Sequence, residues 1–485
     1  MKKTSKSLLL AMGLSLAGAS GALAQQDPSG DGIWTLQEAV EYAKVHNLQV
    51  RQSNLQRKVN EIDYRQSQFN RLPILNANGS YFFNTGSFQD PVTFSVQTQE
   101  AQTGNFSANA SVPLFQGFSL TNQIKQNRLE LEASQQDVLS AQNDITIQIV
   151  TSYLNILFSD ELIKTSELQR DATRQQLERT RKLFDAGSVA ENSVLDLESQ
   201  LATDELNVIN AVNQRDIARL NLMQLLNVQA SEAFSVEIPE LPEPDKDPVI
   251  VDGAQVYDVA VQTLPAIKAV DLRVQSAEKG LAAARGNYFP RLSLAAGINT
   301  RYSSTSSFLV GRENKFVEQV LFTNPQGTEQ QTFYLLQPAP IYDDYAFLDQ
   351  AKDNIGKNYG FTLSVPIFNG FQVRNSVQRA ILSQENAALN ADIARNNLRQ
   401  TIEQAQVDAV AALRRYVAAR EQVRAAERNV RNAELRLNSG IINSVEYVIV
   451  ANTFRSAQSE LLQAKYDYIF KLKVLDFYQG KDISF

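Results

Sequence analysis

The chain has 485 residues, of which 43% are hydrophobic and 20% are charged, and 46 Lys and Arg against 53 Asp and Glu give a formal net charge of -7. This length accommodates two or three domains, and the balanced charge argues against nucleic acid or another polyanion as a partner. The sequence has no cysteine and a single histidine, which excludes disulfides, thiol nucleophiles and zinc ribbons. Since phosphate-binding loops and HExxH or GxSxG motifs are also missing, we expect no enzyme activity, no cofactor and no metal site.

Residues 1–24 have the layout of a secretory signal peptide. Lysines, the first at Lys2, precede an apolar run from Leu8 to Ala17, and Ala22-Leu23-Ala24 supplies the small residues that signal peptidase requires. An N-terminal membrane anchor is the alternative, although the apolar run is short for a membrane span. Later segments fall short of the roughly 18 consecutive apolar residues of a spanning helix, so we expect an exported chain without a helical anchor.

An internal duplication organises the rest of the chain. The segment Val112–Phe118, with the sequence VPLFQGF, recurs as VPIFNGF at Val365–Phe371, and the same offset of 253 residues relates Gly187 to Gly440. A second offset, of 217 residues, relates the helical run 35–72 to the run 252–289. We therefore expect a first repeat over 25–227, a proline-rich linker over 228–254, a second repeat over 255–480 and a tail over 481–485.

Two strands are expected after the first helical run of each repeat. Apolar and polar residues alternate over 74–84 and 105–114 in the first repeat, and over 291–302 and 358–367 in the second. Each run has the length of a tilted strand that crosses an outer membrane, with one face towards lipid and the other towards a lumen. Antiparallel sheets with one wet face in a soluble domain are the alternative.

The membrane interpretation of these strands requires oligomerisation. Four strands cannot close a barrel, and each unpaired backbone group at an open edge in hydrocarbon costs several kcal/mol. Two copies would give a barrel filled by side chains, whereas three copies would leave a lumen. We therefore expect a homotrimer.

Each repeat continues with a long stretch that lacks glycine and proline. The stretches 118–186 and 371–439 predict helices of about 100 Å, and in the second stretch a heptad repeat of apolar residues with interleaved alanines predicts close packing against neighbouring helices. Gly187 and Gly440 permit the left-handed turn that ends a helix, so we expect return helices over 192–227 and 441–479 and two helical hairpins. A soluble two-stranded coiled coil is the alternative for this pattern taken alone.

Each repeat has the order helix, two strands, long helix and return helix. With the paired VPLFQGF and VPIFNGF segments and the tips Leu183–Val189 and Leu437–Ile442, the chain resembles the TolC-type outer membrane efflux channels over essentially its whole mature length. The resemblance implies a mainly α-helical fold with membrane β-structure. Specifically, it implies a long coiled-coil α-helical barrel continuous with a 12-stranded transmembrane β-barrel, completed by a homotrimer with four strands per chain. It also implies the outer membrane of a Gram-negative bacterium, with the helices extending into the periplasm.

The same resemblance implies a passive exit duct of a tripartite efflux or type I secretion system. The chain would contact outer membrane lipid and dock onto a periplasmic adaptor, which links it to an inner-membrane transporter. The positions that match the adaptor-facing turns of the family are Gly187, Ser188, Val189, Gly440, Ile441 and Ile442.

The resemblance also implies an acidic pore constriction near the tips. Glu446 occupies one position of the family's acidic ring, while Ile449 stands where a second acid is often found. Asp196 of the first repeat is equivalent to Ile449, so the ring is expected to combine one acid from each repeat. Ordinary solvated acids, favoured by a helix N-terminus, are the alternative for both positions.

The second strand pair is separated by 36 more residues than the first, over about 304–357, and this stretch is rich in aromatic residues. A self-packed surface loop is the favoured interpretation, and an extracellular cap or a partner-binding surface is the alternative.

Two other functions stay open for the whole chain. One is a secreted or periplasmic coiled-coil scaffold or adhesin without channel activity. The other is a periplasmic adaptor, which should carry lipoyl-like and small β-barrel segments around one hairpin, whereas this chain has two hairpins. An enzyme is less favoured than either.

Overall fold

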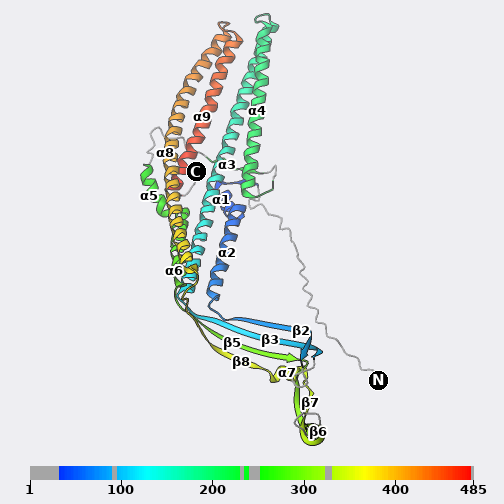
Figure 1. The fold of residues 1–485 in the computed structure, drawn as a ribbon. Helices are drawn as coiled ribbons and strands as arrows, with labels where there is room; N and C mark the ends of the chain where they lie inside the picture. The colour runs from blue at the N-terminus through cyan, green and yellow to red at the C-terminus, as the bar shows by residue number, and fades with distance from the viewer. Residues whose placement is uncertain (1–31, 90–95, 230–233, 240–251, 323–329, 482–485) are drawn as a thin grey trace, which may run out of the picture. The chain divides into compact units, whose positions relative to one another are not determined.

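The computed structural model describes residues 32–89, 96–229, 234–239, 252–322 and 330–481. The expected signal peptide, much of the expected linker and residues 482–485 lie outside this part of the chain. Two compact units are present (Figure 1). The sheet unit comprises residues 54–137 and 265–396, and the hairpin unit comprises residues up to 53 together with 138–264 and 397–485.

The sheet unit is built on four antiparallel strands in the order β2-β3-β5-β8. These are β2 (Ile74–Gln89), β3 (Val96–Gln116), β5 (Arg291–Ser303) and β8 (Gly356–Ser364). β2 follows α2 (Leu48–Phe69), and β5 follows α6 (Pro265–Gly286). β2 and β3 are longer than the sequence pattern indicates, because their pairing continues outward from Asn84 and Ala101 to Gln89 and Val96.

The last strand ends earlier than the expected range 358–367. β8 stops at Ser364, so Val365, Pro366 and Ile367 lie outside it. Ser364 pairs with Arg291, the first residue of β5, so the following residues have no neighbouring strand to pair with, and Pro366 has no N–H to donate.

The two faces of this sheet differ in chemistry. Residues directly opposite each other in an antiparallel pair share a face, and the observed register sorts the side chains accordingly. One face carries the apolar set Ala77, Gly79, Tyr81, Phe106, Ala108, Ile298, Tyr302, Phe361 and Leu363, and the other carries the polar set Asn76, Asn78, Asn105, Ser107, Asn109, Asn299 and Asn358. The charged residues of the polar face in its paired region are Arg291 and Arg301, both on β5.

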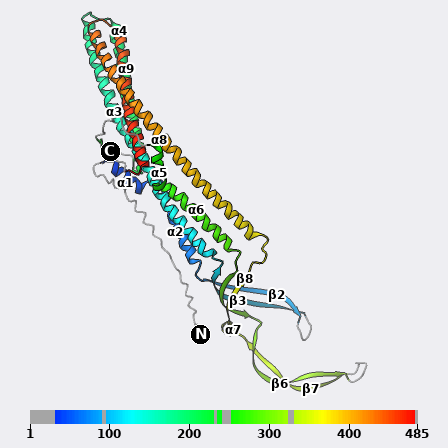
Figure 2. The ribbon, with the colours of Figure 1, turned by 90° about the vertical axis from the view of Figure 1, so that its left-hand side faces the viewer.

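The stretch that was expected to be a surface loop forms regular structure. β6 (Ser307–Phe322) and β7 (Gln330–Asp344) pair as an antiparallel ribbon, and α7 (Phe347–Asp353) then leads into β8 (Figure 2). Aromatic and β-branched residues favour extended, paired backbone, which accounts for a ribbon in place of an irregular loop.

The hairpin unit contains two helical hairpins. One joins α3 (Ser119–Asp185) to α4 (Glu191–Leu226), and the other joins α8 (Gln372–Asn438) to α9 (Ser444–Tyr478). α3 and α8 contribute residues to both units. Heptad positions of α8 are buried, including Ile402, Ala409 and Tyr416, so the alanine-rich seam is a packing surface.

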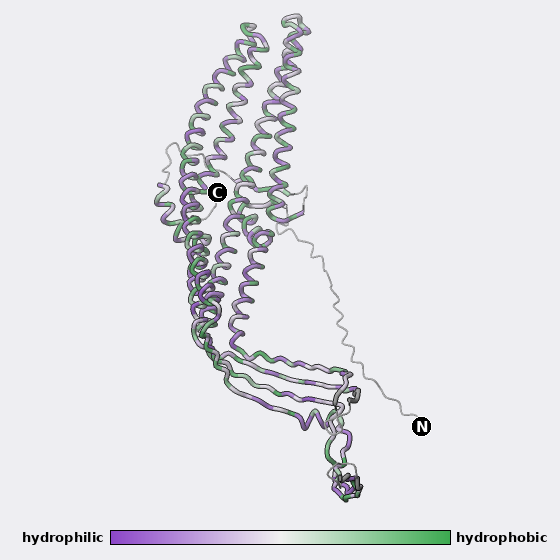
Figure 3. The backbone as a smooth tube through the Cα atoms, in the orientation of Figure 1, coloured by the Kyte–Doolittle hydropathy of each residue, from purple (hydrophilic) through white to green (hydrophobic). Residues whose placement is uncertain are grey.

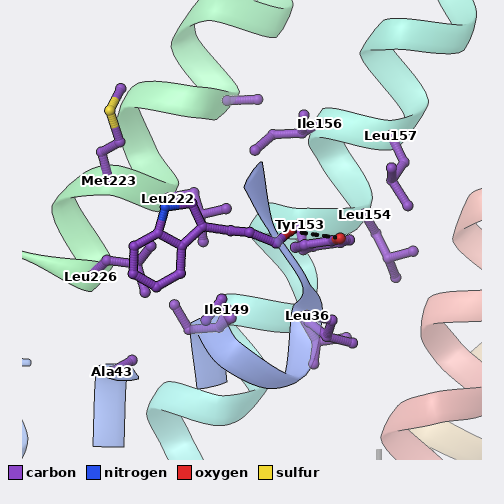
Figure 4. Packing of buried hydrophobic residues seen from close by; sticks show 14 of the residues in the cluster. Leu36, Ala43, Ile149, Tyr153, Leu154, Ile156, Leu157, Leu222, Met223 and Leu226 are labelled. Atoms are coloured by element: carbon purple, nitrogen blue, oxygen red, sulfur yellow. Dashed lines mark hydrogen bonds between the residues drawn. The ribbon is translucent and has the colours of Figure 1, made fainter. Parts of the chain in front are cut away.

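The main core of the hairpin unit surrounds Trp34, whose side chain is 1% exposed. α1 (Leu36–His46) supplies Leu36 and Ala43, while α3 and α4 supply Tyr153 and Leu222 (Figure 4). The single hydroxyl hydrogen of Tyr153 is shared between the Glu237 carbonyl, at 2.6 Å, and the Trp34 carbonyl, at 3.2 Å. These bonds attach α3 to the short parallel pair of β1 (Ile33–Trp34) and β4 (Ser235–Val236).

Near this core, α5 (Gly253–Thr263) packs on α8 through Val256, Ala260 and Ile402. Figure 3 shows hydrophilic and hydrophobic positions alternating along the helices. Among the described residues, none of the helices combines the length and the apolar character needed to cross a membrane.

Gly117, at the junction of β3 and α3, is required by a close backbone approach. It has a φ of 56°, and a Cβ atom there would lie 2.1 Å from the carbonyl oxygen of Gly286. Gly187 also has a positive φ, of 73°, but a Cβ atom there would meet nothing within 4 Å. A side chain at position 187 would therefore introduce backbone strain alone, whereas a side chain at position 117 would introduce backbone strain and a steric clash.

We expect Gly187→Ala to lower the free energy of unfolding by about 1 kcal/mol, through φ strain alone. Gly117→Ala should cost roughly 1–3 kcal/mol more, because β3 and α6 must move apart. Urea unfolding of the purified protein, followed by circular dichroism, measures both. Equal losses in the two variants would contradict the close approach.

Candidate functional site at the hairpin tips

Both hairpins end in the same turn. Gly187 and Gly440 adopt left-handed φ values of 73° and 70°. The N–H of the next residue, Ser188 or Ile441, donates to the carbonyl five positions earlier at 2.8 or 2.9 Å, which is the closing bond of a Schellman motif. In each copy the glycine is therefore favoured because the turn that ends the helix requires a left-handed residue.

Most of the tip residues singled out from the sequence are at the surface. Gly187, Ser188 and Gly440 are exposed, Val189 is partly buried, and Ile441 is 66% exposed. Ile442 differs, because its side chain is only 8% exposed. Ile442 is thus positioned to support the turn from within the subunit and not to present side-chain surface to a partner.

The two acids expected at the constriction have different surroundings. Glu446 lies exposed in the first turn of α9, and its backbone N–H donates to Oδ1 of Asn443 at 2.8 Å. Glu446 makes no ion pair within the described part of the chain. Asp196, on α4, is partly buried and accepts a hydrogen bond from Oγ of Ser444 at 2.9 Å. Glu446 is therefore the freer charge of the two.

In the described part of the chain, the Asp196–Ser444 contact begins a series of three polar contacts spaced along α4 and α9 from the tips. Nδ2 of Asn452 donates to Oε1 of Gln200 at 3.2 Å, and the third contact pairs Asp204 with Arg455 at 2.7 Å. Asp196, Gln200 and Asp204 are four residues apart and share one face of α4. From one contact to the next the residue numbers rise on both helices, so α4 and α9 run parallel to each other where they join the two hairpins.

The Asp204–Arg455 pair is buried. Asp204 has a side chain 1% exposed, and Arg455 one 15% exposed. Thr173 on α3 donates to one carboxylate oxygen of Asp204 at 2.7 Å, and Gln200 donates to the other at 2.8 Å. The Asp204 carboxylate is therefore well satisfied by three side chains from three helices.

Arg455 is less completely satisfied than its partner. In the described part of the chain its Nε and Nη2 atoms are buried without hydrogen-bond partners. Burial lowers the pKa of Arg455, while the Asp204 carboxylate opposes that shift. Two charges held this way cost desolvation that only close pairing offsets, so the pair fixes the alignment of the hairpins more than it adds to stability.

The sequence interpretation missed this pair, although a signal for it exists. Asp204 continues a buried heptad series with Leu197, Ala211 and Ala218. A charged residue on an otherwise apolar seam needs a buried partner. The sequence alone offered no way to choose Arg455 among the many cations of the other hairpin.

A family model described as outer membrane efflux protein matches residues 39–228 and 256–480. The chain belongs to the outer membrane efflux protein family. This efflux family protein is 24% identical over 471 residues to the outer membrane protein TolC of Escherichia coli, covering 96% of this chain and 84% of that relative. It is 22% identical over 356 residues to the alkaline protease secretion protein AprF of Pseudomonas aeruginosa, covering 70% of this chain and 62% of that relative.

Solved structures agree in fold. The outer membrane protein VceC of Vibrio cholerae matches with a TM-score of 0.70 at 15% identity, covering 93% of this chain and 97% of that chain. The CmeC outer membrane channel of Campylobacter jejuni matches with a TM-score of 0.67 at 14% identity, covering 92% and 87%. The TolC-type resemblance, the fold class and the outer membrane location extending into the periplasm are thereby confirmed. The homotrimer stays a prediction.

We expect Asp204→Ala to destabilise the efflux family protein by about 3–5 kcal/mol, because it leaves the Arg455 charge buried without a partner. The control is Arg415→Ala, which breaks the Arg415–Glu460 pair between α8 and α9. Its side chains are 45% and 40% exposed, and we expect a loss below about 1 kcal/mol. Urea unfolding measures both changes.

The double variant Asp204→Leu with Arg455→Met should recover most of the stability that Asp204→Ala loses, because no unpaired charge stays buried. A double variant as unstable as Asp204→Ala would show that packing and not charge pairing dominates at this position.

Proposed function

We propose that this outer membrane channel is the passive exit duct of a tripartite efflux or type I secretion system, working as a homotrimer. The observation that carries the proposal is the open four-stranded sheet with one apolar and one asparagine-rich face. β2 and β8 are its edges, and in hydrocarbon their backbone groups need partners. Pairing β8 of one copy with β2 of the next supplies those partners, and three copies leave a lumen.

The polar face supports a water-filled passage. Its amide and hydroxyl side chains hydrogen-bond water without fixing one ion, and its charges in the paired region are the cationic Arg291 and Arg301. A preference of the channel for cations would therefore have to come from the tips, where Glu446 and Asp196 lie. Like charges brought close in a threefold ring favour cations.

The exposed apolar face argues against a soluble scaffold or adhesin. Tyr359 is 88% exposed, Phe83 is 76% exposed and Leu75 is 74% exposed. Contiguous apolar surface of this kind requires a lipid or protein cover, and lipid is the cover that an outer membrane supplies. We propose no catalytic role, and the described residues contain no group of three or more His, Cys, Asp or Glu suited to a metal ion.

The exposed tips support a periplasmic adaptor as the partner that links the duct to an inner-membrane transporter. Gly187, Ser188, Val189, Gly440 and Ile441 would provide the contact surface, with Ile442 holding the second turn. One relative is named for alkaline protease secretion and another for toxin and drug export, so the proposal covers both polypeptide secretion and efflux.

We expect purified protein in planar bilayers to form cation-preferring channels, and Glu446→Ala with Asp196→Ala to lower the cation-to-anion permeability ratio by at least about twofold. Glu446→Ala alone should account for most of the change, because the Asp196 carboxylate is engaged by Ser444. The control Glu460→Ala removes an acid further along α9 and should leave the ratio unchanged. An unchanged ratio in the double variant would refute the acidic constriction.

The absence of cysteine from the chain permits a clean test of the tips. We expect Ser188→Cys, labelled in cells with a thiol-specific photocrosslinker, to form an adduct with a periplasmic adaptor, identified by mass spectrometry. Ser199→Cys, at an exposed position further along α4, is the matched control and should form none. Equal adducts from both positions, or none from Ser188→Cys, would contradict tip docking.

A further inference from the structure

Helix α7 lies against the apolar face of the sheet. The ring of Phe347 packs edge-on against Tyr302 with centroids 5.0 Å apart and against Phe106 at 5.9 Å. Both partner residues belong to the apolar face, so α7 covers the face that meets lipid. Both views place α7 at the end of β5 and β8 remote from α6 (Figures 1 and 2).

Polar contacts fix α7 in this position. The side chain of Gln350 is fully buried, and it accepts from the N–H and donates to the carbonyl of Ser303, both at 2.9 Å. Oγ1 of Thr300 donates to the Ala351 carbonyl at 2.8 Å. Because each bond ends on the backbone of β5 or α7, these bonds hold α7 against the apolar face of the sheet.

A groove of about 470 Å³ runs between α7 and the sheet. It is lined chiefly by Ala77, Gly79, Phe106, Ala108, Ile298 and Ile355. Ala77, Gly79 and Ala108 are small, whereas Phe106 and Ile298 contribute larger apolar side chains to the lining. Its size lies within the range of small-ligand sites, roughly 300–1,000 Å³, and its surface is mainly apolar.

Aromatic residues mark the level of the groove in the membrane. Tyr81 stacks on Tyr302 with centroids 6.0 Å apart, and Phe106 and Phe347 extend the same cluster. A girdle of aromatic side chains is typical of the boundary between hydrocarbon and headgroups. Since the helices extend into the periplasm and α7 lies at the opposite end of the strands, this boundary belongs to the outer leaflet.

Two lysines lie next to residues that line the groove. Lys357 pairs in register with Ile298, which places it on the apolar face, and Lys352 projects from α7 as an exposed residue. Within the described residues neither lysine is in an ion pair, whereas the nearby Asp353 accepts from the Tyr345 hydroxyl at 2.7 Å. A lysine on a lipid-facing surface is costly unless it reaches the interface or an anion.

We propose that this groove binds one acyl chain of a phosphorylated glycolipid of the outer leaflet, with the lipid phosphate at Lys357 and Lys352. The fixed α7 and the sheet hold the chain between them, and the aromatic cluster sets its depth. The proposal rests on the outer membrane location of the protein and is independent of its conductance.

The test is native mass spectrometry of protein extracted from outer membranes in mild detergent. Ala108→Phe fills the groove, and Ala110→Phe is the matched control, because Ala110 lies on the same strand and the same apolar face but does not line the groove. We expect wild type and Ala110→Phe to retain the glycolipid lipid A, and Ala108→Phe to retain at least about fivefold less.

A second variant avoids any change in packing. Lys357→Gln should weaken retention of lipid A added back to delipidated protein by at least about threefold, with phosphatidylglycerol as the competing phosphate lipid. Equal retention by Ala108→Phe and Ala110→Phe, or equal retention of phosphatidylglycerol and lipid A by wild type, would overturn the proposal. Bilayer conductance of the same samples tests the channel separately, and its loss in all samples would speak against the duct and not against the lipid site.

Discussion

Backbone hydrogen bonding at the edges of the sheet is the constraint on which the rest of the structure depends. Within the part of the chain that the structure describes, β2 and β8 are the two edges of the four-stranded sheet, and each pairs with a neighbouring strand on one side only. Hydrocarbon provides no partner for the backbone groups on the other side. In the homotrimer that we propose, neighbouring copies would pair along these edges. In that assembly the alternation of side chains would decide which face meets lipid and which lines the passage. The helices that continue from the strands would follow the same arrangement of copies.

Much of this could be predicted from the sequence because glycine, proline and periodicity report directly on the backbone. Gly187 and Gly440 marked the ends of the long helices, since a left-handed residue is needed there. The alternation around Ala108 and Asn109 marked strands with two different faces. The recurring VPLFQGF segment reported the duplication, and the family followed from the order of elements.

The features that escaped prediction depend on contacts between distant segments. Arg455 is separated from Asp204 by 251 positions and from its own tip by a series of apolar residues, so only the packing of α4 on α9 brings the two together. Gln350 looked like any polar residue of a surface loop, yet it is buried against Ser303. Ile442 matched an exposed family position but its side chain points inward. Local pattern carries no information about such partners.

The two tips have the same type of turn, but the return helices that follow them begin differently. Asn443 caps α9 through its side chain, whereas Ala190 precedes α4 with no side-chain cap. A missing cap costs a helix end about 1 kcal/mol, so the first turn of α4 frays more readily than the first turn of α9. We therefore expect amides at Glu191 and its neighbours to exchange with solvent sooner than those at Glu446, so that the two copies of the duplicated hairpin would differ in the local stability of their tips.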